Sequence, residues 1–514
     1  MATDADHTGY AQEAVITLPK PLAPGASVTL SVLYAGTIRQ SSSRLELIGT
    51  PAARADHTDW DAIVPTSDAG ATALRGFGNV LWYPVSAPLA LLGDGNKLFA
   101  EVAHQRRLNT DASIALHLTV EYRGDPPDGA IFDGHLEPLA HVADDRDQLV
   151  ADARGVATAD FPLAPIGLRL PSLFLTAQDA APAADGVLEV VTPRPEAIPP
   201  YAEAAQAVAP LLAEWFGPRP RQPLLLLDHA GEPFADHALL VGQLAANAQP
   251  VTIAPLLVDG LTHAWFASAH PWMSEGLAEF MRLLWTEKVQ GRDAAMAELA
   301  TIEGQVAFAE PAASGSAGKE GAPGEALVGA GSPAIYRTKA ATVWWQLREI
   351  LGESTLQKVL IAYRKSEAAN PEFDRDPQAM QKTIERISGR GLNWFFDDWV
   401  YHDHGLPDLS IVEVNPRPVP ASAGKSGGFL VAVEVRNAGD AAAEVPVTVR
   451  SGTALTASER LLIPAHSSAS TRVLFGGTPE TVEVNDGSVP EVGGSAIHTT
   501  HLDLTIDHGP NHPG

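Results

Sequence analysis

The first 195 residues alternate between apolar and polar positions, a period of two that predicts β-strands. Clusters of Gly, Pro and Asp divide this region into short segments, as turns between strands do. The strands that we predict cover Val28–Tyr34, Val80–Val85, Ile114–Tyr122 and Val187–Val191. No segment of helical period stands out here, so we expect an N-terminal β-domain over residues 1–195.

From residue 196 to 408 apolar residues recur at helical spacing, which predicts a mostly helical domain. One apolar stripe comprises Leu277, Phe280, Met281, Leu284 and Trp285, with Ser274 at the expected N-cap. Other helices are predicted over Glu203–Phe216 and over Lys339–Leu351, the latter ending at Gly352. Residues 309–333 are rich in Gly, Ala, Ser and Pro, and we interpret them as a loop insertion.

Alternation returns after Pro407, where Val431, Val433 and Val435 occupy every second position. Residues 409–497 are therefore predicted to form a small β-sandwich, and residues 498–514 a His-containing, solvated tail. The fold class that follows is α+β with several domains: β, then mostly α, then β.

Composition narrows the function classes. The chain has 62 acidic and 35 basic residues and a net charge of −27, which argues against nucleic acid or an anionic membrane surface as partner. It has no cysteine, so His, Asp and Glu are the only strong metal ligands. No apolar run is long enough to span a membrane, and the first ten residues carry no signal peptide, so we expect a soluble protein.

Three residues suggest a metal site. Asp259 and His263 are four positions apart on a predicted helix and so share a face, and Glu275 begins the next helix. Converging oxygen and nitrogen ligands of this kind suit zinc. The alternative is a histidine hydrogen-bonded in a core, with the acids on solvated faces.

This stretch resembles the zinc site of the aminopeptidase-N-like metallopeptidases, a gluzincin family of the MA clan. Their pattern is H-E-x-x-H-x-W-F on one helix and W-x-x-E-G-x-A on the next. The matching residues are His263, Trp265, Phe266, Trp272, Glu275, Gly276 and Ala278. The resemblance implies a thermolysin-like domain over residues 196–408, zinc bound by His263 and Glu275, and a peptide or protein as substrate or ligand.

Weaker likeness extends along the chain. Tyr336, ahead of Lys339, lies where the family has its transition-state-stabilising tyrosine, but two residues separate the pair here and one in the family. Phe234–Leu240 lies about where the family has G-x-M-E-N, with Asp236 as a weak substitute; a loop leading into a strand is the other interpretation. The likeness starts part-way through the first domain, and a preceding segment would carry any signal peptide. The compartment, including an extracytoplasmic one, stays open.

The departures from the family pattern bear on activity. Asp259 replaces the first zinc histidine, Gly260 replaces the catalytic glutamate, and Glu275 follows His263 by only twelve positions. Glycine cannot act as a general base. Glu279, one helical turn after Glu275, is a candidate for a borrowed base, although glutamate ordinarily lies on a solvated face.

Three functions are compatible with these residues. The first is a metallopeptidase homologue whose hydrolysis is impaired or lost. The second is an active zinc metallopeptidase with a variant site of Asp259, His263 and Glu275. The third is a non-catalytic protein whose former cleft binds peptides or serves assembly.

Overall fold

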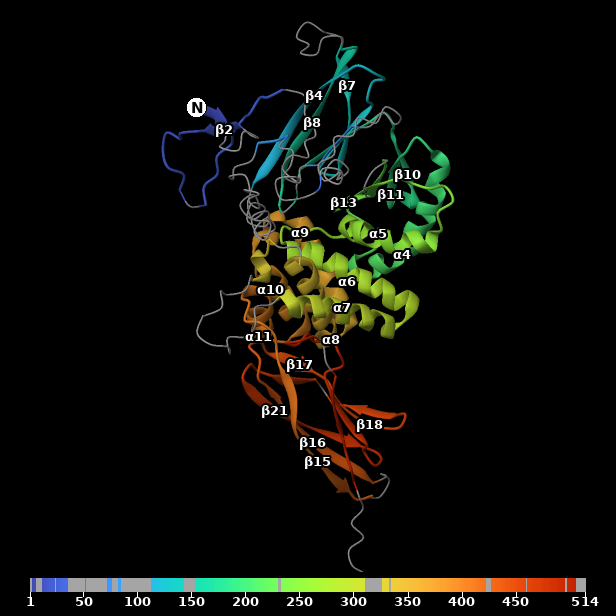
Figure 1. The fold of residues 1–514 in the computed structure, drawn as a ribbon, viewed down its shortest axis with the longest axis vertical. Coiled ribbons are helices and arrows are strands. Elements are labelled where there is room, and N and C mark those ends of the chain that lie inside the picture. The colour runs from blue at the N-terminus through green and yellow to red at the C-terminus, as the bar shows by residue number, and fades with distance from the viewer. Residues whose placement is uncertain are drawn as a thin grey trace, which may run out of the picture. The chain divides into compact units, whose positions relative to one another are not determined.

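The computed structural model describes residues 2–5, 12–23, 25–35, 51, 72–75, 82–84, 112–142, 153–167, 169, 171–229, 233–309, 326–331, 334–421, 427–458, 460–494 and 497–504. The chain divides into two compact units, Met1–Asp179 and Ala180–Gly514. Figure 1 shows strands in the first unit, and a sheet, helices and then further strands in the second. The fold is α+β, as the sequence predicts.

The described strands of the first unit form three antiparallel sheets, with the orders β1-β2, β3-β9-β5-β6 and β4-β8-β7. Trp82, Phe132 and Phe161 lie in its core. The strands are β1 (Ala2–Ala5), β2 (Gln12–Val15), β3 (Thr72–Arg75), β4 (Ser113–Tyr122), β5 (Gly129–Phe132), β6 (His135–Pro138), β7 (Ala140–Val142), β8 (Gly155–Pro165) and β9 (Ser172–Thr176).

The strand predicted over Ile114–Tyr122 is confirmed as β4, whose side chains alternate in burial. The strand predicted over Val28–Tyr34 is wrong, because residues 25–35 form none and Leu33 is fully exposed. Alternation yields a strand only where a neighbouring strand accepts and donates the backbone hydrogen bonds. Of Val80–Val85, residues 82–84 are described and form no strand; the rest lies outside the described residues.

The second unit opens with a five-stranded sheet in the order β10-β11-β12-β14-β13. β11, β12 and β14 are parallel, and β13 is an antiparallel edge strand. The strand predicted over Val187–Val191 is confirmed as β11. The bounds are β10 (Ala180–Ala183), β11 (Leu188–Val191), β12 (Leu224–Asp228), β13 (Phe234–Asp236) and β14 (Leu239–Gly242).

The helices of this unit surround a core rich in tryptophan, and α5 packs between α4 and α6 (Figure 1). The predicted stripe on α6 is buried, apart from the partly buried Trp285. The α-helices are α4 (Ile198–Phe216), α5 (Pro250–Trp265), α6 (Pro271–Gln290), α7 (Arg292–Ala309), α8 (Ala340–Leu351), α9 (Glu353–Ala369), α10 (Ala379–Ser388) and α11 (Asn393–Phe396). Short 3₁₀ and π-helical segments are η2 (Ala184–Gly186), η3 (Pro195–Ala197), η4 (Leu327–Gly329), η5 (Ala334–Lys339), η6 (Pro371–Arg375) and η7 (Asp397–Tyr401). Of the predicted insertion at 309–333, residues 310–325, 332 and 333 lie outside the described residues.

The last strands form sheets in the orders β15-β16-β21, β17-β20 and β19-β18-β22-β23, and Val431, Val433 and Val435 are buried. The tail expected from residue 498 is partly wrong: His498–His501 is strand β23, because it pairs with β22 and His498 contacts buried Glu491. The bounds are β15 (Leu409–Val419), β16 (Gly428–Asn437), β17 (Ala443–Val445), β18 (Val447–Ser451), β19 (Ala454–Ala457), β20 (Leu461–Ile463), β21 (Ser467–Phe475), β22 (Thr481–Val484) and β23 (His498–His501).

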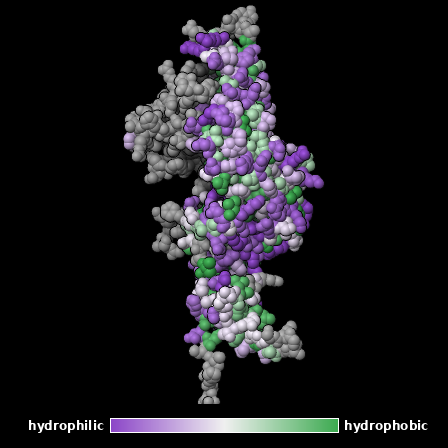
Figure 2. All heavy atoms as spheres, turned by 90° about the vertical axis from the view of Figure 1, so that its right-hand side faces the viewer, coloured by the Kyte–Doolittle hydropathy of each residue, from purple (hydrophilic) through white to green (hydrophobic). Residues whose placement is uncertain are grey.

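The surface over the helices is mostly hydrophilic on the face drawn in Figure 2, and its apolar patches are small. This agrees with the high net charge of the chain. Within the described part of the chain, none of the helices combines the length and the apolar character needed to cross a membrane.

Candidate metal centre

Helices α5 and α6 bring His263 and Glu275 together. The distance from His263 Nε2 to Glu275 Oε1 is 3.5 Å. A tetrahedral zinc ion with bonds of about 2.0–2.2 Å separates its ligand atoms by about 3.3–3.6 Å. Both residues are buried, at 3% and 8% exposure. One ion can therefore bridge this pair without rearrangement of either helix.

His237 joins this pair from a third element. It lies in the turn between β13 and β14, with a positive φ of 54° that is uncommon for a residue other than glycine. Its Nε2 is 3.9 Å from Glu275 Oε1, and its ring centroid is 4.8 Å from that of His263. The three potential ligand atoms lie within 4.8 Å of one another.

The far side of each imidazole has a partner that orients the ring. His237 Nδ1 is 2.9 Å from Asp236 Oδ1, and His263 Nδ1 is 3.3 Å from Ser274 Oγ. The Asp236 carboxylate can only accept, so it favours the His237 tautomer with the proton on Nδ1 and the Nε2 lone pair facing Glu275. The Ser274 hydroxyl can donate or accept, and it holds the His263 ring with its Nε2 toward Glu275. Metal-binding histidines are commonly held in this way. His263 Nε2 is buried without a hydrogen-bond partner, so a metal ion fits this donor set.

Ser274 contacts His263 because it does not cap its helix. The N-cap predicted at Ser274 is wrong: α6 begins three residues earlier, at Pro271, with His270 as its N-cap. Proline at the first position of a helix lacks the N–H that would otherwise be unsatisfied there. Ser274 is thus buried inside the first turns of α6, where its hydroxyl reaches the His263 ring.

The second oxygen of Glu275 is held by Arg337. The Nε and Nη2 of Arg337 donate hydrogen bonds of 2.8 and 2.5 Å to Glu275 Oε2. Burial raises the pKa of Glu275, but positive charge on His263, Arg337 and His237 outweighs this effect and lowers the pKa to about 2. Burial lowers the pKa of His263, which favours the neutral imidazole that binds metals. Glu275 therefore faces both histidines as a carboxylate.

The close approach of α8 and η5 to α6 depends on Gly276. A Cβ at this position would lie 2.4 Å from the Cβ of Ala340. Beside it, Trp272 and Trp344 stack with centroids 5.2 Å apart, and Trp344 Nε1 donates to the Trp272 carbonyl oxygen. The absence of a side chain at position 276 therefore lets η5 carry Arg337 to Glu275.

The short connection between α5 and α6 is held by Asp374, a buried residue of η6. Its carboxylate accepts hydrogen bonds from the Ser268 hydroxyl, at 2.8 Å, from the Ala269 backbone N–H and from the Tyr363 hydroxyl, at 2.7 Å. This anchor explains how twelve positions between His263 and Glu275 suffice to bring them together.

Asp259 lies beside the group but outside it. Its Oδ2 is 3.9 Å from His263 Nε2, and about a third of its side chain is exposed, at 32%. The predicted ligand set was Asp259, His263 and Glu275. The structure brings all three near one another and adds His237, which shares the compact group with His263 and Glu275.

Position 260 faces the sheet. A Cβ on Gly260 would lie 2.7 Å from Leu224 Cδ1 and 3.6 Å from the His237 carbonyl oxygen. Leu224 is fully buried on β12. Leu224 therefore occupies the space that a side chain at position 260 would need. A glutamate there would have to displace Leu224.

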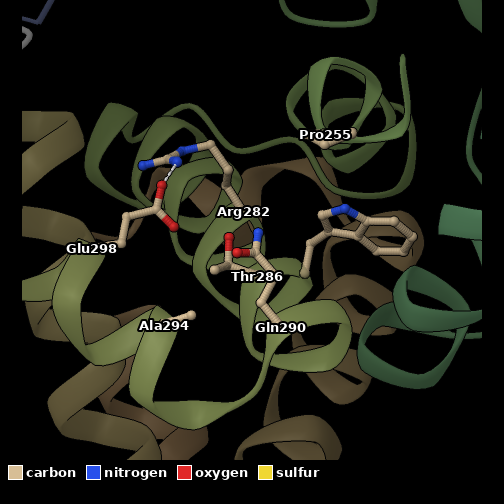
Figure 3. A pocket seen from close by; sticks show the side chains of 7 residues that line it. Pro255, Arg282, Thr286, Gln290, Ala294 and Glu298 are labelled. Atoms are coloured by element: carbon tan, nitrogen blue, oxygen red, sulfur yellow. Dashed lines mark hydrogen bonds and ion pairs between the residues drawn. The ribbon is translucent and has the colours of Figure 1, made fainter. Parts of the chain in front are cut away.

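The other two catalytic candidates are Glu279 and Tyr336. Glu279 accepts a hydrogen bond of 3.1 Å from Arg282 Nε, and the same guanidinium pairs with Glu298 (Figure 3). Arg282 and Glu298 border a hollow of about 350 Å³, whose lining residues include neither Glu279 nor the histidine cluster. Tyr336 is buried in η5 immediately before Arg337. Tyr336 and Lys339 both lie on this π-helical segment.

Sequence reasoning missed His237, Arg337 and the role of Ser274. The dipeptide Asp236-His237 carries the clearest signal, since a carboxylate next to a histidine can fix the tautomer of a ligand. Arg337 has no motif of its own. Its contact with Glu275 depends on the packing of η5 against α6.

Neither a protein-family model nor a curated protein matches this sequence. Among solved structures, the chain is similar to a two-domain M1 zinc metallopeptidase, a mutant bound to L-tryptophan. That match has a TM-score of 0.37 and 19% identity, and it covers 58% of this chain and 65% of the other. This chain thus spans slightly less than two thirds of that structure.

Proposed function

We propose that this chain is a metallopeptidase-like protein that binds zinc through His237, His263 and Glu275 and hydrolyses peptides weakly or not at all. The observation that carries the proposal is the pairing of a compact His/His/Glu group with a glycine at position 260. The ligands of such a site are present, whereas the base of the family pattern is absent.

Three residues would bind the zinc ion, and Arg337 would position one of them. His237 and His263 present their Nε2 atoms, and Glu275 presents Oε1 while Arg337 holds its other oxygen. Zinc held there would supply Lewis-acid polarisation of a carbonyl and a more acidic water. Hydrolysis also needs a group that accepts the proton of the attacking water, and such a base raises the rate about 10²–10⁴-fold. Gly260 has no such group, so the expected peptide turnover is low.

The test combines metal analysis with a repaired site. The protein purified without chelator should contain one tightly bound zinc that His263→Ala removes. Gly260→Glu combined with Leu224→Val introduces the carboxylate and removes the Leu224 Cδ1 that would lie 2.7 Å from the new Cβ. Because a base contributes about 10²–10⁴-fold, even a poorly placed glutamate should raise zinc-dependent peptide hydrolysis about tenfold or more.

The matched control is Leu224→Val alone, which changes the packing without adding a base and should leave turnover unchanged. The proposal of weak or absent hydrolysis would be overturned if the wild type cleaved peptides at ordinary enzymatic rates of about 1–10³ s⁻¹ and His263→Ala abolished this cleavage. Absence of zinc binding by the wild type would overturn the metal site.

A second candidate function is an active hydrolase in which Asp259 is the base. It is favoured by the 3.9 Å distance between Asp259 Oδ2 and His263 Nε2 and by the partial exposure of Asp259 to incoming solvent. Asp259→Asn distinguishes the two candidate functions. If Asp259 is the base, this change should abolish turnover and leave zinc bound. If the site lacks a base, the change should alter neither turnover nor zinc binding.

A further inference from the structure

A second group of potential ligands lies where the helices give way to the C-terminal strands. Asp397 begins the π-helical segment η7, and His402 and His404 follow it on the connection to β15. The three residues are exposed, and their potential ligand atoms lie within 4.8 Å of one another. None of them belongs to the buried site.

His402 is held against Asp397 by two contacts. Its Nδ1 is 2.8 Å from Asp397 Oδ1, and its backbone N–H donates to the Asp397 carbonyl oxygen at 3.1 Å. The rings of His402 and His404 have centroids 5.4 Å apart and planes inclined by 38°. His402 has an extended backbone, and the ring of His404, two positions later, lies on the same side as that of His402.

The residue between them is fixed in the opposite direction. Asp403 is buried against Lys339, with Nζ 3.0 Å from Oδ1 and side-chain exposures of 1% for Lys339 and 2% for Asp403. The backbone N–H of Gly405 donates to the same oxygen at 3.2 Å. Gly405 adopts a φ of 101°, which turns the chain toward β15. This anchor fixes the backbone between the two histidines before any ion arrives, which reduces the entropy lost on binding.

We propose that Asp397, His402 and His404 form a second, exposed site for a divalent transition-metal ion. Two imidazole nitrogens and one carboxylate oxygen suit zinc or copper rather than calcium or magnesium, which prefer oxygen ligands. Remaining coordination positions are open to water. An ion there joins the last turn of the helical region to the connection that leads into β15, and so stiffens that connection. The proposal is independent of the buried site.

The experiment counts zinc ions on the full chain at pH 7.5, where neutral imidazoles bind metals. Chelator-treated protein is titrated with Zn²⁺ alone by calorimetry and by equilibrium dialysis. Wild type should bind two ions, with the exposed site the weaker. His402→Ala with His404→Ala should remove the weaker ion, lowering its affinity by about 100-fold or more, since even an outer-shell change costs 10–100-fold, and should leave the tighter ion unchanged.

His508→Ala with His512→Ala is the matched control, because it removes two histidines from the end of the chain and should leave both ions bound. Asp397→Asn should weaken only the second ion, about tenfold. Persistence of two ions in the His402/His404 variant, or loss of the second ion in the His508/His512 variant, overturns the proposal. A single ion lost only on His263→Ala also overturns it, whereas a single ion lost only on the His402/His404 change overturns the buried site instead.

Discussion

The buried cluster of His237, His263 and Glu275 and the exposed cluster of Asp397, His402 and His404 are assembled in different ways. The buried residues come from a hairpin turn and two helices, and each has an orienting partner: Asp236, Ser274 and Arg337. The exposed residues come from one run of eight positions, held by a single buried pair. Long-range assembly fixes all ligands before binding, whereas local assembly fixes the backbone and leaves the side chains in water.

This difference predicts that the buried site is the tighter and more selective one. Ligands whose rotamers are set by packing lose less entropy on binding than exposed side chains do. The buried site also depends on groups from many parts of the chain, so it should be sensitive to changes at a distance. The four predictions below test this contrast.

The largest expected effect is that of His237→Ala. If His237 rather than Asp259 completes the buried site, this change should lower zinc affinity at the tight site about 10³-fold, beyond the 10–100-fold typical of outer-shell changes. Calorimetry with Zn²⁺ measures it. Asp259→Asn is the control and should change the affinity little. The reverse ranking of the two variants would assign the third ligand to Asp259.

Acid should weaken the metal-free protein around Glu275. The pKa of this carboxyl is about 2 in the folded protein and 4.5 as a reference value. A lowered pKa stabilises the fold above 4.5, and the contribution is lost as pH falls from 4.5 toward 2. By pH 3 the loss is about 2 kcal/mol, at 1.36 kcal/mol per unit.

Hydrogen exchange of the α6 backbone amides between pH 7 and pH 3 measures this loss. Glu275→Gln cannot titrate, so its local stability should decline less over the same interval. The side chain of Arg337 is about half exposed, at 46%, so water can hydrate its guanidinium when glutamine replaces its partner Glu275. An equal decline in the two proteins would falsify the assignment of the lowered pKa to Glu275.

Asp236→Asn should have the next effect, a 10–100-fold loss of zinc affinity at the tight site. The amide has the size of the carboxylate, but it holds the His237 Nδ1 proton more weakly because it lacks the charge. The exposed site serves as an internal reference, since its affinity should stay constant in the same titration. An unchanged tight site would show that Asp236 does not orient His237.

The smallest expected effect concerns the anchor of the exposed site. Lys339→Met with Asp403→Asn removes both charges of the buried pair, which avoids leaving one buried charge uncompensated. Zinc affinity at the exposed site should fall about threefold to tenfold, since only preorganisation is lost. The tight site should keep its affinity. If zinc affinity fell as far as in His402→Ala with His404→Ala, the connection that carries the two histidines would not form without the Lys339–Asp403 pair.

The sequence by itself determined the type and the approximate limits of the long elements. The α6 stripe and the valines of β16 are periodic over several turns or residue pairs, and burial of an apolar face repeats at the period of the element. Weak alternation misled at Val28–Tyr34, where pairing requires an edge elsewhere in the chain. The ends of elements were also less certain, as Ser274 and His498 show.

At the candidate site, the sequence shows the spacing of His263 and Glu275 and the glycine at position 260, because each is a local property. The tertiary structure alone decided that His237 faces them, that Arg337 takes the second oxygen of Glu275, and that Leu224 fills the space beside Gly260. These three contacts join elements that are distant in the chain. Their distances are set by how helices and strands pack, and no local pattern of residues encodes that packing.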